Sequence, residues 1–241
     1  MNMLKSSDLS WSTILGYGVG HIFNDICASM WFTYLLLFFQ KVLYFQTVDS
    51  GVLLLVGQIA DGISTTIVGI LASKLSNLFF CRKYGGRKSW HLIGSACVLV
   101  SFPFIFLPCI GCETALRGTQ MFYYSCFIIL FQFGWACVQI SHLALVTQLS
   151  DKGETRTLLT SLRYLGTVVA NVLVYAVTWL FFGLEGGNND ISSKDSEKFR
   201  NVMLVGVGVG CVTTALFHIL VREPDTRSFQ QERTCRSLLR P

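Results

Sequence analysis

The sequence predicts an all-α membrane protein with six transmembrane helices. Hydrophobic residues make up 52% of its 241 residues and charged residues only 14%, whereas charged residues are about 25% of a soluble domain. Six apolar stretches each reach the length of roughly 20 residues that crosses a bilayer as a helix. Together they occupy most of the chain, so no large soluble domain fits beside them.

The six stretches run over residues 12–39, 49–75, 90–110, 119–149, 158–183 and 201–221. Residues 1–11 contain one lysine and no small-residue cleavage site, so the first stretch is expected to be a retained helix and not a signal peptide. The fourth stretch is long, which indicates tilt or an extension beyond the bilayer. The expected organisation is an N-terminal tail of residues 1–11, a bundle of residues 12–221 and a C-terminal tail of residues 222–241.

The distribution of Lys and Arg predicts the orientation. Six crossings place both termini on one side of the membrane, and that side receives 14 of the 19 basic residues. Because basic loops stay in the cytoplasm, both tails are expected there and the polar loop 185–200 is expected to be extracytoplasmic. The formal net charge of +5 therefore reflects orientation, and nucleic acid is not expected as a partner. The other side holds Lys41, Arg117, Lys194, Lys198 and Arg200.

Three polar residues lie close together in the first stretch. His21, Asn24 and Asp25 are spaced by three and four residues, which places them on one face of a helix. A carboxylate beside an imidazole can exchange a proton or hold a substrate ammonium group. Charge at membrane depth is costly and usually serves a function. The structural alternative is a polar cluster that joins helices.

The second stretch carries small and polar residues at strict four-residue spacing. Small residues alone would indicate close helix packing, but the carboxylate of Asp61 indicates an ion, proton or substrate path. Asp61 and Thr65 are therefore candidate binding residues. The whole stripe consists of Gly57, Asp61, Thr65, Gly69 and Ser73.

A second polar stripe lies on one face of the fourth predicted helix. Its amides and indole could line an aqueous cavity as hydrogen-bond partners, and a polar seam inside the bundle is an equal alternative. The stripe consists of Gln132, Trp135, Gln139 and His142.

The fifth predicted helix carries Arg163, Thr167 and Asn171 at four-residue spacing. Arg163 closely follows a charged segment, so an ion-pair network at the cytoplasmic end is favoured for it over substrate binding. Together with the basic loop before the third helix, this gives an expected conformational network of Arg87, Lys88, Asp151, Glu154, Arg156 and Arg163.

The remaining motifs do not indicate an enzyme. Most of the nine cysteines are scattered through apolar stretches, where they act as small apolar residues. Cys109-x-x-Cys112 falls at the extracytoplasmic end of the third helix, where a disulfide and a metal contact are both open, although a single CxxC is a weak signal. We find no nucleophile–base set and no metal-ligand cluster, so no catalytic residue and no cofactor is expected.

Several motifs together are similar to a known family. The run Asp61-Gly62-x-x-Thr65-x-x-x-Gly69 precedes the basic loop Arg82–Lys88, and Glu154-x-Arg156 precedes Arg163. This combination resembles the N-terminal half of the major facilitator superfamily, in its glycoside–pentoside–hexuronide:cation symporter branch, over almost all of residues 10–221. Residues 20–34, GHIFNDICASMWFTY, resemble an animal group of this branch that is associated with cysteine import into lysosomes and melanosomes.

The resemblance implies a fold, an activity and partners. Members have twelve helices and hold a small solute between two six-helix halves, so this chain is expected to supply one half and not to transport alone. The bacterial symporters have a second acid where Thr65 stands, which favours a proton over sodium as the coupling ion or facilitated transport. The implied partners are a small-molecule substrate, the lipid bilayer and a proton or sodium ion.

Other functions fit the same residues. A truncated form without transport activity could associate with a full-length homologous chain, and a homodimer could restore twelve helices. A sugar or lysolipid cation symporter is a further alternative within the branch. The resemblance places the protein in the lysosomal or melanosomal membrane, with the plasma membrane as the alternative.

The orientation can be tested by labelling. A cysteine introduced at Asn189 is expected to react with a membrane-impermeant maleimide only from the extracytoplasmic side, because its loop follows the fifth crossing. A cysteine at Lys152, in the loop before that crossing, is the control and should react only from the cytosol. The reverse pattern would overturn the orientation.

Overall fold

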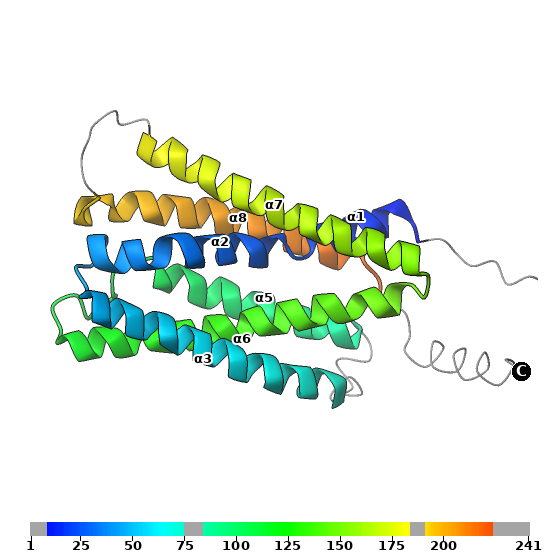
Figure 1. The fold of residues 1–241 in the computed structure, drawn as a ribbon, viewed down its shortest axis with the longest axis horizontal. Coiled ribbons are helices and arrows are strands. Elements are labelled where there is room, and N and C mark those ends of the chain that lie inside the picture. The colour runs from blue at the N-terminus through cyan, green and yellow to red at the C-terminus, as the bar shows by residue number, and fades with distance from the viewer. Residues whose placement is uncertain (1–8, 75–83, 184–190, 224–241) are drawn as a thin grey trace, which may run out of the picture.

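The computed structural model describes residues 9–74, 84–183 and 191–223, and its described elements are all helical (Figure 1). Six helical segments are long and apolar enough to cross a membrane. This confirms the predicted all-α bundle. The predicted tails lie largely outside the described residues, as do much of the basic loop and part of the loop 185–200. The elements are α1 (Trp11–Val19), α2 (Ile22–Leu37), a π-helical turn (Phe38–Val42), α3 (Thr47–Lys74), α5 (Gly86–Ile105), α6 (Arg117–Leu149), α7 (Gly153–Gly183), a 3-10 turn (Ser193–Asp195) and α8 (Ser196–Leu220).

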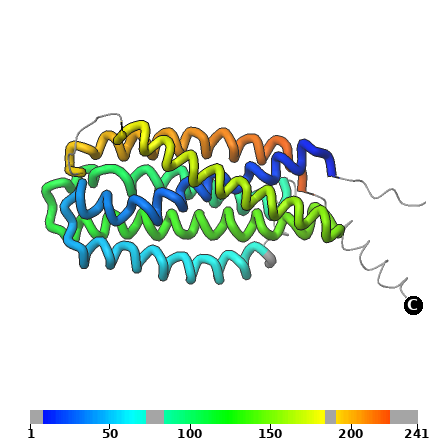
Figure 2. Tube along the Cα trace, turned by 45° about the horizontal axis from the view of Figure 1, so that its top comes forward, coloured from blue at the N-terminus to red at the C-terminus, as the bar shows by residue number. Residues whose placement is uncertain are grey.

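The helices form two layers of an elongated bundle (Figures 1 and 2). A terminal layer contains α1, α2, α7 and α8, which pack mainly on one another. A middle layer contains α3, α5 and α6, with α6 packed between the other two. Each layer therefore has more contacts inside itself than with the other. We call the end of the bundle where α1 begins and α8 ends the α1 end.

The first crossing is interrupted. α1 ends at Val19 and α2 begins at Ile22, with Gly20 and His21 between them in a turn. At the interruption the Gly20 amide donates to the carbonyl of Tyr17, three residues back, at 3.1 Å. The predicted helix over residues 12–39 is thus two helices that share one crossing.

The third crossing begins earlier than expected. The sequence predicts a start near residue 90, whereas α5 begins at Gly86. The Glu223 carboxylate, which follows α8, accepts hydrogen bonds from the backbone amides of Arg87 and Lys88 at 2.9 and 3.0 Å. A carboxylate at a helix N-terminus stabilises that terminus. The partner lies more than 130 residues away in the chain, so local sequence did not indicate it.

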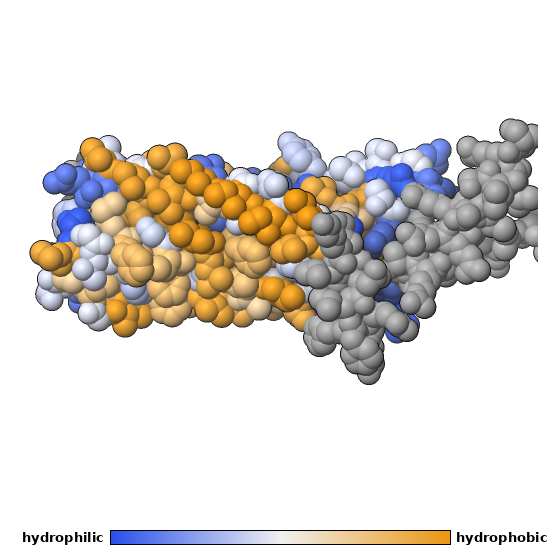
Figure 3. All heavy atoms as spheres, turned by 90° about the horizontal axis from the view of Figure 1, so that it is seen from below, coloured by the Kyte–Doolittle hydropathy of each residue, from blue (hydrophilic) through white to orange (hydrophobic). Residues whose placement is uncertain are grey.

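Aromatic side chains fill the core between the layers at the end opposite the α1 end. Phe38 contacts Phe106 across the layers and Phe199 within its own layer, at ring-centroid distances of 5.6 and 5.4 Å. Phe39 contacts Tyr124 edge-on at 5.0 Å. Apolar side chains also cover much of the face of the bundle seen in Figure 3. Many large apolar side chains of α7 are exposed as well. Such a surface suits a lipid environment.

Two glycines bring α5 and α6 into close contact. A Cβ atom on Gly94 would lie 2.6 Å from both the Cys137 Cβ and the Gly134 carbonyl oxygen. A Cβ on Gly134 would lie 2.8 Å from both the Cys97 Cβ and the Gly94 carbonyl oxygen. Small residues at matched positions let membrane helices approach closely, so this pair holds the middle layer together.

We therefore expect Gly94→Ala to destabilise the bundle by about 1–3 kcal/mol through overpacking. Gly62→Ala on α3 is the matched control, because nothing lies within 4 Å of a Cβ there, and it should be neutral or stabilising by about 0.5–1 kcal/mol. Thermal unfolding in detergent micelles measures both. Equal unfolding temperatures for the two variants would contradict the close contact.

Candidate functional site

A charged cluster lies inside the terminal layer, where α2 begins. The His21 Nδ1 atom lies 3.0 Å from the Asp25 Oδ1 atom. The other ring nitrogen, Nε2, lies 3.1 Å from Nη2 of Arg163 on α7. Thr167, one turn further along α7, donates its hydroxyl to Asp25 Oδ2 at 3.1 Å. Arg163 and Asp25 thus have opposite charges and face each other through one imidazole.

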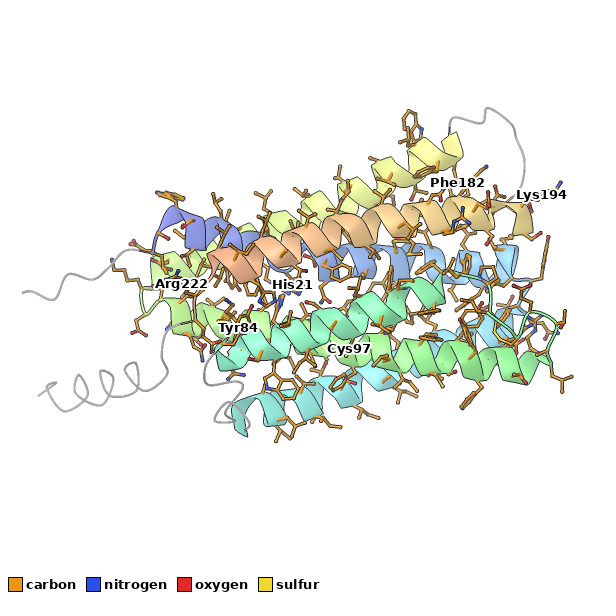
Figure 4. The ribbon with its side chains drawn as sticks, turned by 180° about the vertical axis from the view of Figure 1, so that it is seen from behind. His21, Tyr84, Cys97, Phe182, Lys194 and Arg222 are labelled. Atoms are coloured by element: carbon orange, nitrogen blue, oxygen red, sulfur yellow. A yellow bond between two sulfur atoms is a disulfide. The ribbon has the colours of Figure 1, made fainter. Side chains whose placement is uncertain are left out.

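The cluster is withdrawn from solvent. His21 is 3% exposed, Asn24 is 2% exposed and Asp25 is 7% exposed, and His21 points into the interior of the bundle (Figure 4). Asn24 Nδ2 lies 3.4 Å from His21 Nε2, while Asn24 Oδ1 and Arg163 Nε are buried with no hydrogen-bond partner among the described residues. The face that the spacing of His21, Asn24 and Asp25 predicts is therefore formed.

All four histidines of the chain gather around the interruption between α1 and α2. His91 of α5 bonds through Nε2 to the Gly20 carbonyl at 3.0 Å. His142 of α6 bonds through Nε2 to the Tyr17 carbonyl at 2.8 Å, and its ring lies 5.4 Å from that of His21. His218 of α8 bonds to His91 at 3.2 Å. Two histidines of the middle layer therefore donate hydrogen bonds to the backbone carbonyls of Gly20 and Tyr17 at this interruption.

The histidine contacts continue to the α1 end. Because His91 Nε2 faces a carbonyl, it carries the proton, and Nδ1 of a neutral His91 accepts from His218. Tyr84, before α5, lies 2.9 Å from His218 Nδ1. Burial raises the pKa of the Tyr84 phenol, so it is protonated at neutral pH and can donate to His218. Sequence analysis did not select His91 or His218 for the site, although a histidine within an apolar stretch was a usable signal.

The α6 stripe is divided: His142 lies beside His21, at a ring-centroid distance of 5.4 Å, and the other three residues have no described contact with His21. On α6, Trp135 Nε1 donates to Gln139 Oε1 at 2.9 Å. Gln132 is buried, and its Nε2 lies 3.2 Å from the position that a Cβ on Gly57 would take. His142 shares the predicted face but has its Nε2 on a backbone carbonyl.

Asp61, the candidate carboxylate of α3, lies outside the His21 cluster. The half-buried Asp61 accepts a hydrogen bond from the exposed Thr65 at 3.4 Å. The structure gives no contact between this pair and the His21 cluster. Ser73 of the same stripe lies beyond the described side chains of α3.

The residues of the expected ion-pair network lie in separate places in the structure. Arg156 pairs with Asp151 at 3.3 Å and donates through Nε to the Ser150 carbonyl at 2.7 Å. Glu154 is exposed, and Arg163 lies with His21 instead of this group. The grouping of Arg163 with Arg156 followed sequence proximity, whereas its partner is 142 residues away.

The basic residues before α5 make a third set of contacts, with the end of α8. The Lys88 ammonium donates to the carbonyls of His218 and Val221 at 3.0 and 2.7 Å. Gly85 has a φ of +107°, and a Cβ there would lie 2.4 Å from Glu223. A residue without a side chain is needed at this crossing of the two segments.

At the opposite end, Cys109 and Cys112 form a disulfide, which resolves the two alternatives that the CxxC left open. A cavity of about 330 Å³ lies beside it, and its lining includes Cys109, Glu113, Gln120 and Ser193. Among the described residues no group of three or more His, Cys, Asp or Glu side chains is arranged to hold a metal ion.

Comparison with known proteins identifies the family. Residues 16–238 match the family of MFS/sugar transport proteins. Human major facilitator superfamily domain-containing protein 12 is 48% identical over 227 residues, which are 89% of this chain and 47% of that protein. The mouse protein of the same name is 47% identical over 225 residues, or 89% of this chain and 46% of that protein.

A more distant relative is an uncharacterized symporter of the cyanobacterium Synechocystis, 25% identical over 176 residues, which are 70% of this chain and 31% of the symporter. The chain spans about half the length of the curated animal relatives it matches. The six apolar helices and the match over most of the chain both indicate a membrane transport family. The chain belongs to the MFS/sugar transport protein family of the major facilitator superfamily.

Proposed function

We propose that the chain supplies one half of a transporter of a small solute, and that the cluster around His21 binds the solute or its coupling proton. The observation that carries this proposal is the contact of the half-buried Arg163 and the buried Asp25 with the same His21 ring. Charged side chains are rare within membrane helices and are usually retained on substrate, ion or proton pathways. The interruption of the first crossing supports the same place, because broken helices commonly form binding sites in transporters.

The solute that fits this cluster best is a small amino acid. A guanidinium binds a carboxylate with paired hydrogen bonds, and the Asp25 carboxylate can hold an ammonium group. Arg163 and Asp25 therefore match the two charges of a zwitterion. We propose cysteine because the sequence resembles an animal group associated with its import into lysosomes and melanosomes. The same resemblance supports a lysosomal or melanosomal membrane, and the Lys and Arg distribution supports cytoplasmic termini.

A proton is the proposed coupling ion. A histidine can bind and release a proton, and a carboxylate in contact with it stabilises its charged form. Thr65, which bonds to Asp61, stands where the bacterial symporters have a second acid, so the pair has one negative charge fewer for a sodium ion. Asp61 and the α6 residues Gln132, Trp135 and Gln139 are proposed to line the solute path between the two halves.

We expect Asp25→Asn and Asp61→Asn each to abolish uptake of radiolabelled L-cysteine by the chain joined to the second half of a curated relative. Asparagine keeps the size of the side chain and removes its charge. Asp49→Asn is the matched control, since Asp49 pairs with Arg117 at 4.0 Å near the opposite end, and uptake should persist. Normal uptake by both single variants, at equal expression, would remove Asp25 and Asp61 from the path.

Residues 1–241 alone are expected not to transport. A site between two halves has one wall in this chain, and unpaired polar groups that face lipid cost free energy. Purified chain in liposomes should take up no L-cysteine beyond empty liposomes, with or without a proton gradient, while the joined protein should. Saturable uptake by the purified chain would show that the second half is dispensable.

A further inference from the structure

The contacts of the two ring nitrogens of His21 indicate where its proton sits, although Nδ1 faces Asp25 without the alignment of a hydrogen bond. An arginine side chain can only donate hydrogen bonds, so the contact from Arg163 Nη2 at 3.1 Å requires a lone pair on His21 Nε2. A neutral His21 therefore carries its proton on Nδ1, 3.0 Å from Asp25 Oδ1. This assignment places a neutral ring between a cation and an anion that have no direct contact.

Asn24 holds an unused acceptor beside the same ring nitrogen. Its Nδ2 lies 3.4 Å from His21 Nε2, and its Oδ1 is buried without a partner among the described residues. A half-turn of the amide exchanges the positions of these two atoms. Oδ1 would then face Nε2 and could accept a hydrogen bond. Asn24 can thus donate a hydrogen bond to Nε2 of a neutral His21 and, after a half-turn of its amide, accept one from Nε2 of a protonated His21.

Arg163 can form a hydrogen bond with His21 only while the ring is neutral. A proton on Nε2 removes the only atom of His21 that accepts from the guanidinium, and it places two positive charges against each other. Arg163 Nε already has no partner among the described residues, so the guanidinium in its present place uses only part of its donor capacity. Protonation of His21 therefore drives Arg163 away from the ring, while Asp25 gains a full positive charge beside it.

We propose that His21 is the proton-binding group of this protein and that a proton on its Nε2 atom releases Arg163 to bind the carboxylate of the solute. The proposal rests on the proposed transport function. It adds the atom that takes the proton, the group that is displaced and the chemical group of the solute that uses it. The proton comes from water, no covalent bond of the solute changes, and the proton returns to water when Arg163 reoccupies His21.

The other titratable and charged groups near the ring are placed differently. Tyr17 of α1 stacks on His142 of α6 at 4.1 Å, and His142 has its Nε2 on a carbonyl. His91 of α5 bonds to Gly20 and His218 of α8, with Lys88 on the α8 carbonyls beyond. Each of these histidines contacts backbone, a phenol or another imidazole. Among the residues that the structure describes, His21 is the histidine that contacts a carboxylate, which would stabilise its charged form.

Proton and carboxylate binding must then favour each other. If the protonated state binds a carboxylate about tenfold more tightly, the carboxylate raises the midpoint of the His21 titration by about one pH unit, because coupling between two binding sites is reciprocal. This link gives a readout that does not depend on transport.

The test is a nitrogen NMR titration of the whole chain, labelled with ¹⁵N-histidine and placed in lipid nanodiscs. The resonances lost in His21→Gln identify this ring. We expect a neutral form protonated on Nδ1 and one protonation step. Arg163→Met should raise the midpoint by about one pH unit, since it removes a positive charge and a donor. Asn24→Leu should lower the midpoint, because it removes the acceptor for the charged ring.

His218→Gln serves as the control, because His218 bonds to His91 and has no recognised hydrogen bond to His21. It should leave the His21 midpoint in place. The titration itself is recorded on the wild-type chain, and His21→Gln is needed only to assign the resonances. A His21 ring protonated on Nε2 when neutral, or a midpoint that is indifferent to Arg163→Met, would overturn the proposal.

The solute is tested on the chain joined to the second half of a curated relative, with three probes: L-cysteine, cysteamine, which lacks the carboxylate, and acetate. L-cysteine and acetate should raise the His21 midpoint, and cysteamine should not. If acetate raises the midpoint and L-cysteine does not, the release of Arg163 is supported and the choice of cysteine under the proposed function is wrong. If neither carboxylate moves the midpoint, the release of Arg163 to a carboxylate is wrong.

Discussion

The structure depends on how backbone carbonyls are satisfied where the first crossing is interrupted. Water does not reach polar groups in the hydrocarbon region, so each unpaired carbonyl there costs free energy. His91 and His142 donate to the carbonyls of Gly20 and Tyr17 from two helices of the other layer. The Tyr17 carbonyl also accepts from the Gly20 amide, whereas the Gly20 carbonyl has its hydrogen bond from His91 of the middle layer. The position of the interruption also determines where α2 begins and hence where His21 and Asp25 lie.

The same arrangement explains how charge is held at this depth. A buried ion pair gains little when the cost of removing both ions from water is counted, and loss of one partner leaves an uncompensated charge. Here a neutral imidazole separates Arg163 from Asp25, and Thr167 supplies a further hydrogen bond to the carboxylate. Arg163 and Asp25 are therefore not neutralised by a direct contact with each other.

The sequence predicts the helical layout well and the long-range contacts poorly. Apolar length alone identifies the crossings, and the spacing of His21, Asn24 and Asp25 places them on one face. Spacing within one segment cannot identify partners from distant segments, such as Arg163 for His21 or Glu223 for the start of α5. His91 was missed for the same reason, since its role depends on a carbonyl of another helix. The roles of Asp61, Gln132 and Gln139 remain predictions.

The two layers are joined by contacts of different kinds at their two ends. Near the α1 end the links are directional: imidazole to carbonyl, and the Glu223 and Lys88 contacts between α5 and the end of α8. Toward the other end, Phe38, Phe39, Phe106 and Tyr124 meet through aromatic faces and edges. Hydrogen bonds weaken steeply with misalignment, whereas aromatic rings accept several geometries at similar energy. Sliding of one layer against the other is therefore resisted mainly near the α1 end. We expect the two layers to move relative to each other most at the aromatic end and to stay fixed near the histidines.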